Sequence, residues 1–350
     1  MILLLGRAAD PVIQRLSSAL AAAGQEFATI DPADHPGTVR IELTLTDGKV
    51  SGSLDTGSRR TPMEEVQAVF DRADSTSARP GPDGRPRGPG PDLLLAEFVD
   101  HVTALVVNPA SAQASNASKP YQYGAIRAAG LAVPKTLVTS DPDAARDILD
   151  DHPEGVIYKS VSSVRSKVSL LDAAAAGRLD DVRSGPVQLQ EYVAGQDVRV
   201  HVIAGEAFAR AVTSTASDYR YPQTDAEAPR IGPFTLPDAV RDACVNLADR
   251  LGLYLAGLDL RRRPDGRWVC FEANPQPAYT FYEPAHDDHV TPALVRLLTT
   301  GECRPDVHDE HLVPIPTHLC LRAASEIPDA SIPAKPRSPF ITRDLRPDLL

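Results

Sequence analysis

The sequence predicts an α/β protein of the α+β class, in which a parallel βαβ opening precedes a region of antiparallel hairpins. Residues 1–5 are an apolar run of strand length, residues 11–23 have the length and pattern of a helix, and residues 27–30 form the next apolar run. Asp10 before Pro11 is a typical helix N-cap. Further along, short apolar runs are joined in pairs by turn sequences, which is typical of hairpins.

The remainder of the N-terminal region predicts a hairpin, a short strand and a helix. Residues 41–54 predict the hairpin, with Thr46-Asp47-Gly48 as its turn, and residues 68–70 predict the strand. Residues 75–91 are dense in Pro, Gly and Arg, which indicates a mobile loop, and a helix follows over 91–102. No Gly-x-Gly-x-x-Gly fingerprint follows the first strand, so the opening carries no dinucleotide signature.

From Ser118 onward the pattern predicts a smaller α+β unit and then an antiparallel sheet. The expected helices are 120–129, a helix that starts at Ser140-Asp141-Pro142, and 237–251; the expected strands are 136–139, 155–159, 187–193, 197–203 and 207–213. We therefore expect an N-terminal domain (1–117), a central subdomain (118–190), a C-terminal subdomain (191–300) and a proline-rich tail (301–350).

Composition excludes several classes of function. The 350 residues contain 36 Lys and Arg against 47 Asp and Glu, a formal net charge of −11, which argues against nucleic acid as a partner. No apolar run approaches the roughly 20 residues of a membrane span, so no membrane partner is expected. The four cysteines lack metal-binding spacing and suit reduced thiols, which predicts a cytoplasmic protein. A homodimer is compatible with the sequence.

An acidic set late in the chain is the most informative chemical feature. Asp259 and Glu272 each lie in a short apolar run, and the turn sequence Arg263-Pro264-Asp265-Gly266-Arg267 separates the two runs. The runs therefore predict a hairpin that brings the two acids together, with Asn274 on the same face as Glu272 because strand residues two apart share a face. Carboxylate and amide oxygens are the ligands that Mg²⁺ prefers, so these three residues are the predicted metal site.

Basic residues earlier in the chain suit phosphate binding. Lys159 ends an apolar strand, and a lysine in such a place is expected to face an anion. The hydroxyl-rich and basic run that follows, residues 160–168 with Ser163 inside it, suits a lid that folds over phosphates. Lys119 precedes Pro120 at a predicted helix start; alone, it is equally compatible with a surface lysine.

The run from Gln190 to Arg199 has the features of a nucleotide-binding hinge. The backbone of Glu191, Tyr192 and Val193 can bind the edge of a purine, and the Glu191 side chain can accept from its exocyclic amine. Asp197 can hold a ribose hydroxyl. Asp197 and Arg199 share one strand face, so a plain cross-strand ion pair is the structural alternative.

Two further groups of polar residues lie in predicted loops or near segment ends. Arg220, in a predicted loop, suits a clamp for a carboxylate or phosphate. The segments 286–289 and 308–311 each carry two histidines and two acids, but no cysteine or third histidine completes a zinc site, so we expect ordinary polar surface there.

The order of these features resembles the ATP-grasp ligases. The likeness covers roughly residues 100–300 and is greatest to the branch of ribosomal-protein S6 glutamate ligase and the graspetide-type peptide maturases. It rests on Pro134 to Pro142, Asp197-Val198-Arg199 and Glu272-Ala273-Asn274-Pro275. The resemblance implies an ATP-grasp fold with an N-terminal βαβ pre-ATP-grasp domain, a central small α+β domain and a C-terminal antiparallel-sheet domain.

The resemblance also implies roles for individual residues, with ATP and Mg²⁺ as cofactors. Phosphate contacts fall to Lys119 and Lys159, adenine contacts to the hinge 191–193, magnesium binding to Asp259, Glu272 and Asn274, and contacts with the γ-phosphate or acceptor carboxylate to Arg199 and Arg220.

The predicted function is an ATP-dependent carboxylate–amine ligase that forms an acyl phosphate. Residues 276–283, Gln-Pro-Ala-Tyr-Thr-Phe-Tyr-Glu, depart from the Gly-Gln-Trp-type stretch of graspetide maturases, so we expect an amino acid or similar small carboxylate and a small amine as substrates. One alternative is a maturase that forms side-chain amides or esters in a precursor peptide. The other alternative is a nucleotide-binding protein without ligase activity.

Overall fold

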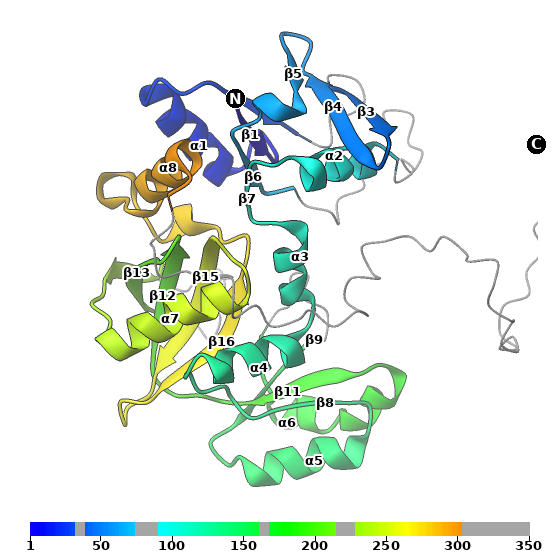
Figure 1. Cartoon of the computed structure of the whole chain (residues 1–350). Helices are drawn as coiled ribbons and strands as arrows, with labels where there is room; N and C mark the ends of the chain where they lie inside the picture. Colours follow the sequence, from blue (N-terminus) through cyan, green and yellow to red (C-terminus); the bar gives the residue numbers. More distant parts are fainter. Residues whose placement is uncertain (32–38, 74–89, 161–167, 215–227, 303–350) are drawn as a thin grey trace, which may run out of the picture.

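The computed structural model describes residues 1–31, 39–73, 90–160, 168–214 and 228–302. In the view of Figure 1 the N-terminal sheet lies at the top, a large antiparallel sheet in the middle and a smaller sheet at the bottom. The α+β class predicted from the sequence is confirmed, whereas the predicted domain boundaries stay a prediction.

The N-terminal sheet is parallel and confirms the βαβ opening. Its strand order is β2-β1-β6-β7, with bounds β1 Ile2–Leu5, β2 Phe27–Ile30, β6 Ala68–Asp71 and β7 Leu105–Val107. Helix α1 (Pro11–Ala22) connects β1 to β2, and the Asp10 side chain caps it by accepting from the backbone N–H of Val12 at 2.8 Å.

A small antiparallel sheet is inserted between β2 and β6. It consists of the predicted hairpin, β3 (Arg40–Thr46) and β4 (Lys49–Asp55), and of β5 (Arg60–Pro62), a strand that the sequence pattern did not indicate. A short 3₁₀ turn, η2 (Met63–Glu65), leads into β6, and helix α2 (Gly90–His101) leads toward β7.

The smaller sheet contains the strand that carries Lys159. The chain enters it through α3 (Ala110–Gln113), η3 (Ala114–Ala117) and α4 (Lys119–Ala128). The strand order is β10-β9-β11-β8, with bounds β8 Thr136–Thr139, β9 Val156–Ser160, β10 Ser169–Leu170 and β11 Val187–Glu191. Its helices are α5 Pro142–Asp151, α6 Ala173–Ala176 and η4 Leu179–Ser184. Residues of α5, η4, β9 and β11 form a buried cluster on one face of this sheet.

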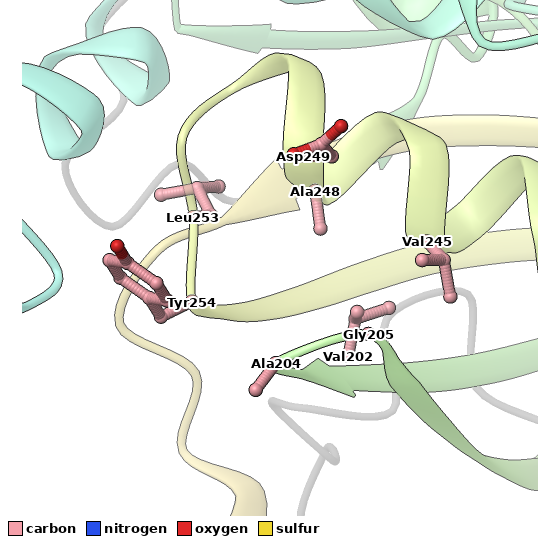
Figure 2. A pocket seen from close by; sticks show the side chains of 8 residues that line it. All are labelled: Val202, Ala204, Gly205, Val245, Ala248, Asp249, Leu253 and Tyr254. Atoms are coloured by element: carbon pink, nitrogen blue, oxygen red, sulfur yellow. The ribbon is translucent and has the colours of Figure 1, made fainter. Parts of the chain in front are cut away.

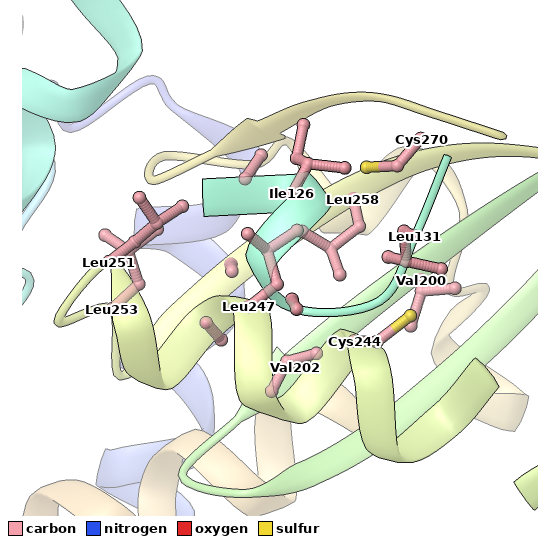
Figure 3. Close-up of a cluster of buried hydrophobic side chains, with 14 of the residues drawn as sticks. Ile126, Leu131, Val200, Val202, Cys244, Leu247, Leu251, Leu253, Leu258 and Cys270 are labelled. Carbon is pink, nitrogen blue, oxygen red and sulfur yellow. The ribbon is translucent and has the colours of Figure 1, made fainter. Parts of the chain in front are cut away.

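The large sheet is antiparallel and holds the acidic hairpin. Its order is β14-β13-β12-β15-β16, with bounds β12 Gln196–Ile203, β13 Glu206–Thr213, β14 Arg230–Pro233, β15 Leu255–Arg262 and β16 Trp268–Asn274. Helices α4 and α7 (Asp238–Arg250) cover one face, where Val200 and Leu258 are fully buried (Figure 3). Because strand side chains alternate, Arg199 and Asp259 lie on the opposite face.

The segment after β16 connects the large antiparallel sheet to the N-terminal parallel sheet and its helix α1. It runs through η5 (Tyr279–Phe281) and η6 (Ala285–Asp287) into α8 (Val290–Thr300), which packs against α1 in one buried cluster. The Asn108 amide, at the end of β7, donates to the backbone carbonyls of Leu255 and Pro275, each at 2.7 Å. Among the described helices, each is too short or too polar to cross a bilayer.

Candidate active site

The acidic hairpin predicted from the sequence is present. Asp259 on β15 lies opposite Glu272 on β16, and Gly257 lies opposite Asn274. A turn closes the hairpin, with the Arg263 N–H donating to the Arg267 carbonyl at 2.8 Å. The register shifts between Asp259 and Leu260, a β-bulge of the kind that re-aims side chains next to active sites.

Lys119 is the direct partner of Glu272. Its Nζ lies 2.6 Å from Glu272 Oε2. Burial raises the pKa of Glu272, but the charges of Lys119, Lys159 and Arg199 outweigh it and lower the pKa to about 2. Glu272 is therefore ionised near neutral pH and surrounded by the cations that the sequence assigned to phosphate binding.

Arg199 is buried beside Asp259 and forms an ion pair with it. Its side chain is 5% exposed, and its guanidinium lies 5.2 Å from the ring centre of Tyr282. A β-carbon on Gly257 would overlap the Arg199 guanidinium and lie 2.5 Å from Cβ of Pro277. The absence of a side chain at Gly257 thus leaves the space that the Arg199 guanidinium occupies.

Lys159 lies on the face of the smaller sheet that turns away from α5. It is opposite Gln188 on β11, whereas the neighbouring Leu189 is buried in the α5 cluster. Its charge lowers the pKa of Glu272, which is consistent with an orientation toward the acidic hairpin. The sequence analysis did not single out Gln188, which is 2% exposed and whose Nε2 has no hydrogen-bond partner among the described residues.

The Glu191 side chain is already engaged. Its Oε1 accepts from Arg263 at 2.9 Å and from the Lys135 N–H at 3.0 Å. An exocyclic amine would therefore share this oxygen with two existing donors. Tyr192 next to it is 39% exposed and Val193 is buried. The backbone N–H groups of Glu191 and Tyr192 donate to the carbonyls of Lys135 and Gly155.

Asp197 and Arg199 do not pair with each other. Asp197 accepts from Arg261 Nε at 2.7 Å, whereas Arg199 pairs with Asp259. Both are cross-strand pairs between β12 and β15, in line with the register of the two strands. Asp197 therefore forms a cross-strand ion pair, which was the structural alternative to a role in ribose binding, but its partner is Arg261 and not Arg199.

Some predicted residues lie outside the described ranges. They are Ser163 with lid residues 161–167, Arg220, and the tail from 303 onward.

The acids at 287 and 288 are engaged by arginines. Arg210 Nη1 lies 2.5 Å from Asp287, and Arg15 Nη1 lies 3.2 Å from Asp288. Within the described ranges, no cluster of three or more His, Cys, Asp or Glu residues is arranged to hold a metal ion.

A small pocket is lined by residues of α7, of the end of β12 and the turn after it, and of the segment that leads into β15 (Figure 2). Its volume of about 20 Å³ suffices for about one water molecule. Its lining residues are Val202, Ala204, Gly205, Val245, Ala248, Asp249, Leu253 and Tyr254. We do not assign a substrate to this pocket.

The residues of the acidic hairpin fit a magnesium-bound nucleoside triphosphate. Asp259, Glu272 and Asn274 supply hard oxygen donors. Asp259 Oδ1 is buried and ion-paired with Arg199 Nη1, while Arg199 Nε is buried without a hydrogen-bond partner among the described residues. Lys119 and Arg199 on either side supply the positive charge that phosphate oxygens require.

The chain is similar to solved structures of ATP-grasp ligases. No family model matches the chain. The ATP-grasp ligase PsnB complexed with a minimal precursor is 26% identical, with a TM-score of 0.69 over 85% of this chain and 97% of that one. The macrocyclase MdnC of Microcystis aeruginosa MRC, bound with its precursor peptide MdnA, is 19% identical, with a TM-score of 0.71 over 85% and 98%.

Two further likenesses extend the set. A RiPP-associated ATP-grasp ligase of Chryseobacterium gregarium, in complex with ADP and a leader and core peptide, is 18% identical with a TM-score of 0.73 over 86% and 97%. The curated relative beta-citrylglutamate synthase B of Danio rerio is 23% identical over 261 residues, 70% of this chain. The chain spans 60% of the length of that relative. The chain therefore has the ATP-grasp fold and groups by that fold with the ATP-grasp ligases, which confirms the resemblance found in its sequence.

Proposed function

We propose that this protein is an ADP-forming ligase that activates a carboxylate as an acyl phosphate and passes it to an amine or hydroxyl. The observation that carries the proposal is the cross-strand pair Asp259 and Glu272, placed between Lys119 and Arg199. A carboxylate is a poor electrophile, and phosphorylation makes it a good one. Such chemistry needs positioned charges and alignment more than protein nucleophiles.

Each residue of the site has a role in this proposal. Asp259, Glu272 and Asn274 would hold Mg²⁺, and Lys119 and Lys159 would offset the phosphate charge. MgATP, when bound, supplies the γ-phosphoryl group. Arg199, together with Arg220 of the undescribed segment, would orient the substrate carboxylate and offset charge as it moves onto the phosphoryl oxygens. The charges of Lys119, Lys159 and Arg199 lower the pKa of Glu272, so this carboxylate needs no change of protonation before it binds a cation.

The hinge and the lid complete the nucleotide site in this proposal. The backbone of residues 191–193 would bind adenine, Asp197 would contact the ribose, and Ser163 with the rest of residues 160–168 would cover the phosphates. Exclusion of water is needed because an acyl phosphate hydrolyses readily when it is exposed.

We infer that the substrate is a peptide. The likeness to PsnB, which is complexed with a precursor in its structure, extends over most of both chains and supports this choice. The chain itself offers a surface that suits a peptide: Phe281, beside Tyr282, is 50% exposed at the end of the segment that follows Asn274. This inference replaces the small carboxylate that the departure at 276–283 led the sequence analysis to favour.

A small carboxylate remains the second candidate. The similarity to beta-citrylglutamate synthase B favours it, because that name indicates a product built from small acids. The two candidate functions use the same nucleotide site and differ in the substrate whose carboxylate binds beside Arg199.

One experiment tests both. Purified protein is incubated with MgATP and hydroxylamine, together with either free L-glutamate or acetylated, amidated peptides that contain Asp and Glu. Hydroxylamine traps acyl phosphates as hydroxamates, so ADP release coupled to hydroxamate formation is expected with the peptides. Peptides that also carry Lys, Ser or Thr should lose one water per bond when hydroxylamine is omitted. ADP and hydroxamate from L-glutamate alone would favour the small carboxylate, and neither product from any acid would contradict the proposal.

A further inference from the structure

A buried ion pair outside the predicted site lies on the same face of the large sheet as Arg199, because Arg210 is the cross-strand partner of Arg199. Arg210 on β13 donates to Glu283 through Nε and Nη2, at 2.8 and 2.9 Å. The Arg210 side chain is 3% exposed and that of Glu283 is fully buried. Two parallel charge-assisted bonds of this kind fix both position and orientation. Removing one partner of such a pair is costly because the other charge stays buried.

The pair anchors the segment that follows β16. The backbone carbonyl of Glu283 accepts from Arg15 on α1 at 2.5 Å, and its Oε2 also accepts from the His289 N–H at 3.0 Å. Glu283 is thus held from the large sheet, from the N-terminal helix and from its own segment. The residue before it, Tyr282, is consequently fixed in place.

Tyr282 faces Arg199. The guanidinium carbon lies 5.2 Å from the ring centre, within the range of a cation–π contact. The Tyr282 ring also packs against the buried ring of His201, at 5.6 Å between centroids. Arg199 is therefore held by the Asp259 carboxylate and the Tyr282 ring, with Gly257 leaving the space that it occupies.

We infer that Tyr282 is a positioning residue that holds the Arg199 guanidinium for the substrate carboxylate, and that the buried Arg210–Glu283 pair holds Tyr282. This inference rests on the proposed function, in which Arg199 contacts the carboxylate. A guanidinium fixed before binding loses less rotational freedom when it meets its ligand, so loss of the ring should weaken carboxylate binding more than nucleotide binding.

The same sheet contains a matched control. The Arg261 guanidinium lies 5.3 Å from the ring centre of Phe271, and Arg261 pairs with Asp197 as Arg199 pairs with Asp259. Phe271→Leu removes a ring from an arginine that we do not place against the carboxylate. Tyr282→Phe is the conservative control, because it keeps the ring and removes only the hydroxyl.

The first readout does not depend on activity. Aromatic ring currents shift nearby nuclei, so the ¹⁵N-labelled Arg199 Nε–H signal, assigned with Arg199→Lys, should move in Tyr282→Leu and stay in place in Tyr282→Phe and Phe271→Leu. The Arg261 signal should respond only to Phe271→Leu. An Arg199 signal that is unchanged in Tyr282→Leu would overturn the contact.

The second readout is kinetic and uses the acidic peptide with hydroxylamine. Tyr282→Leu should raise the KM for the peptide about tenfold, equivalent to roughly 1.4 kcal/mol, while the KM for MgATP stays within about twofold. Tyr282→Phe should restore the peptide KM. Wild-type kinetics in Tyr282→Leu, with Arg199→Lys impaired, would overturn the inference alone. If Arg199→Lys also leaves the peptide KM unchanged, the proposed role of Arg199 fails instead.

The anchor is tested separately with a neutral pair. Arg210→Met combined with Glu283→Gln removes both buried charges and keeps Tyr282, so the fold can be retained where the single variants lose stability. A melting temperature near that of the wild type with a raised peptide KM is the expected result. Recovery of both stability and peptide KM would show that the pair only stabilises the fold.

Discussion

Two arginine–aspartate pairs cross the same strands of the large sheet, and they differ in how fully their polar atoms are used. Arg261–Asp197, near the hinge, is saturated: Arg261 donates to Asp197 and also to the Val193 carbonyl at 2.7 Å. Arg199–Asp259, near Glu272, is not. Asp259 Oδ1 contacts Arg199 Nη1, but Arg199 Nε is buried and has no hydrogen-bond partner among the described residues.

The difference distinguishes a scaffold from a site. Buried polar atoms without partners are costly, and proteins keep them where a ligand completes them. Arg199 is also the more deeply buried of the two arginines: its side chain is 5% exposed, against 19% for Arg261. Loss of the Arg261–Asp197 pair should cost only the free energy of its own contacts. Loss of the Arg199–Asp259 pair should also weaken ligand binding and lower the reaction rate.

The largest expected effect follows from this contrast. Asp259→Asn should lower kcat for ADP formation by roughly 10²–10³-fold, the scale seen when one charge-stabilising group is lost from an active site. Asp197→Asn should change kcat far less and act on the KM for ATP. Steady-state ADP release by both variants, with melting curves as the folding control, checks the contrast. Equal losses in the two variants would remove the distinction between the pairs.

Lys159 extends the comparison to the smaller sheet. Lys159→Ala should weaken ATP binding about tenfold or more, because a charge-assisted contact contributes about 1.5–3 kcal/mol. Lys135→Ala is a control on the same subdomain, since Lys135 pairs with Asp151 at a site where both side chains are more than half exposed. Calorimetric titration with AMPPNP measures both. Unchanged affinity in Lys159→Ala would make this lysine structural.

Gly257 tests the packing that lets Arg199 lie beside Asp259. Gly257→Ala should destabilise the fold by about 1–3 kcal/mol, the usual cost of overpacking, because its β-carbon meets the Arg199 guanidinium. Gly232 on β14 has no atom within 4 Å of the place where a β-carbon would lie, so Gly232→Ala is the matched control. Urea unfolding of both variants gives the result. Equal stabilities would show that the arginine moves aside without cost.

The pKa of Glu272 gives a smaller effect with a defined sign. Its folded value of about 2 lies below its ordinary value of 4.5, so the stabilisation is complete above pH 4.5 and is lost as pH falls toward 2. Between pH 6 and 3.5 the wild type should lose on the order of 1 kcal/mol more stability than Glu272→Gln does. Urea unfolding across this range measures the difference. Parallel curves for the two proteins would contradict the shift.

Local patterns were enough to predict the hairpin but not its partners. The turn 263–267 is local, so the sequence alone places Asp259 opposite Glu272. The βαβ opening was predictable for the same reason, since its cap and stop signals directly flank the helix. In contrast, strand β5 has only three residues and no alternation to detect.

Long-range contacts explain what the sequence could not show. Glu191 meets Arg263 across 72 residues, and this contact changes the role expected of its side chain. Arg210 and Glu283 are 73 residues apart, and neither belongs to a recognisable motif. Gln188 is a polar residue within a strand pattern, and only its burial beside Lys159 distinguishes it. Such residues are identified by packing, which spacing in the sequence does not encode.

Binding of MgATP at the hairpin that carries Asp259 and Glu272 can be tested by one titration that needs no knowledge of the substrate. AMPPNP binding is measured by calorimetry with and without Mg²⁺, for the wild type and for Glu272→Gln. Mg²⁺ should strengthen AMPPNP binding to the wild type, and this gain should be lost in Glu272→Gln. The melting temperature of Glu272→Gln at pH 7 is the control for its folding. An equal magnesium-dependent gain in both proteins would contradict the account.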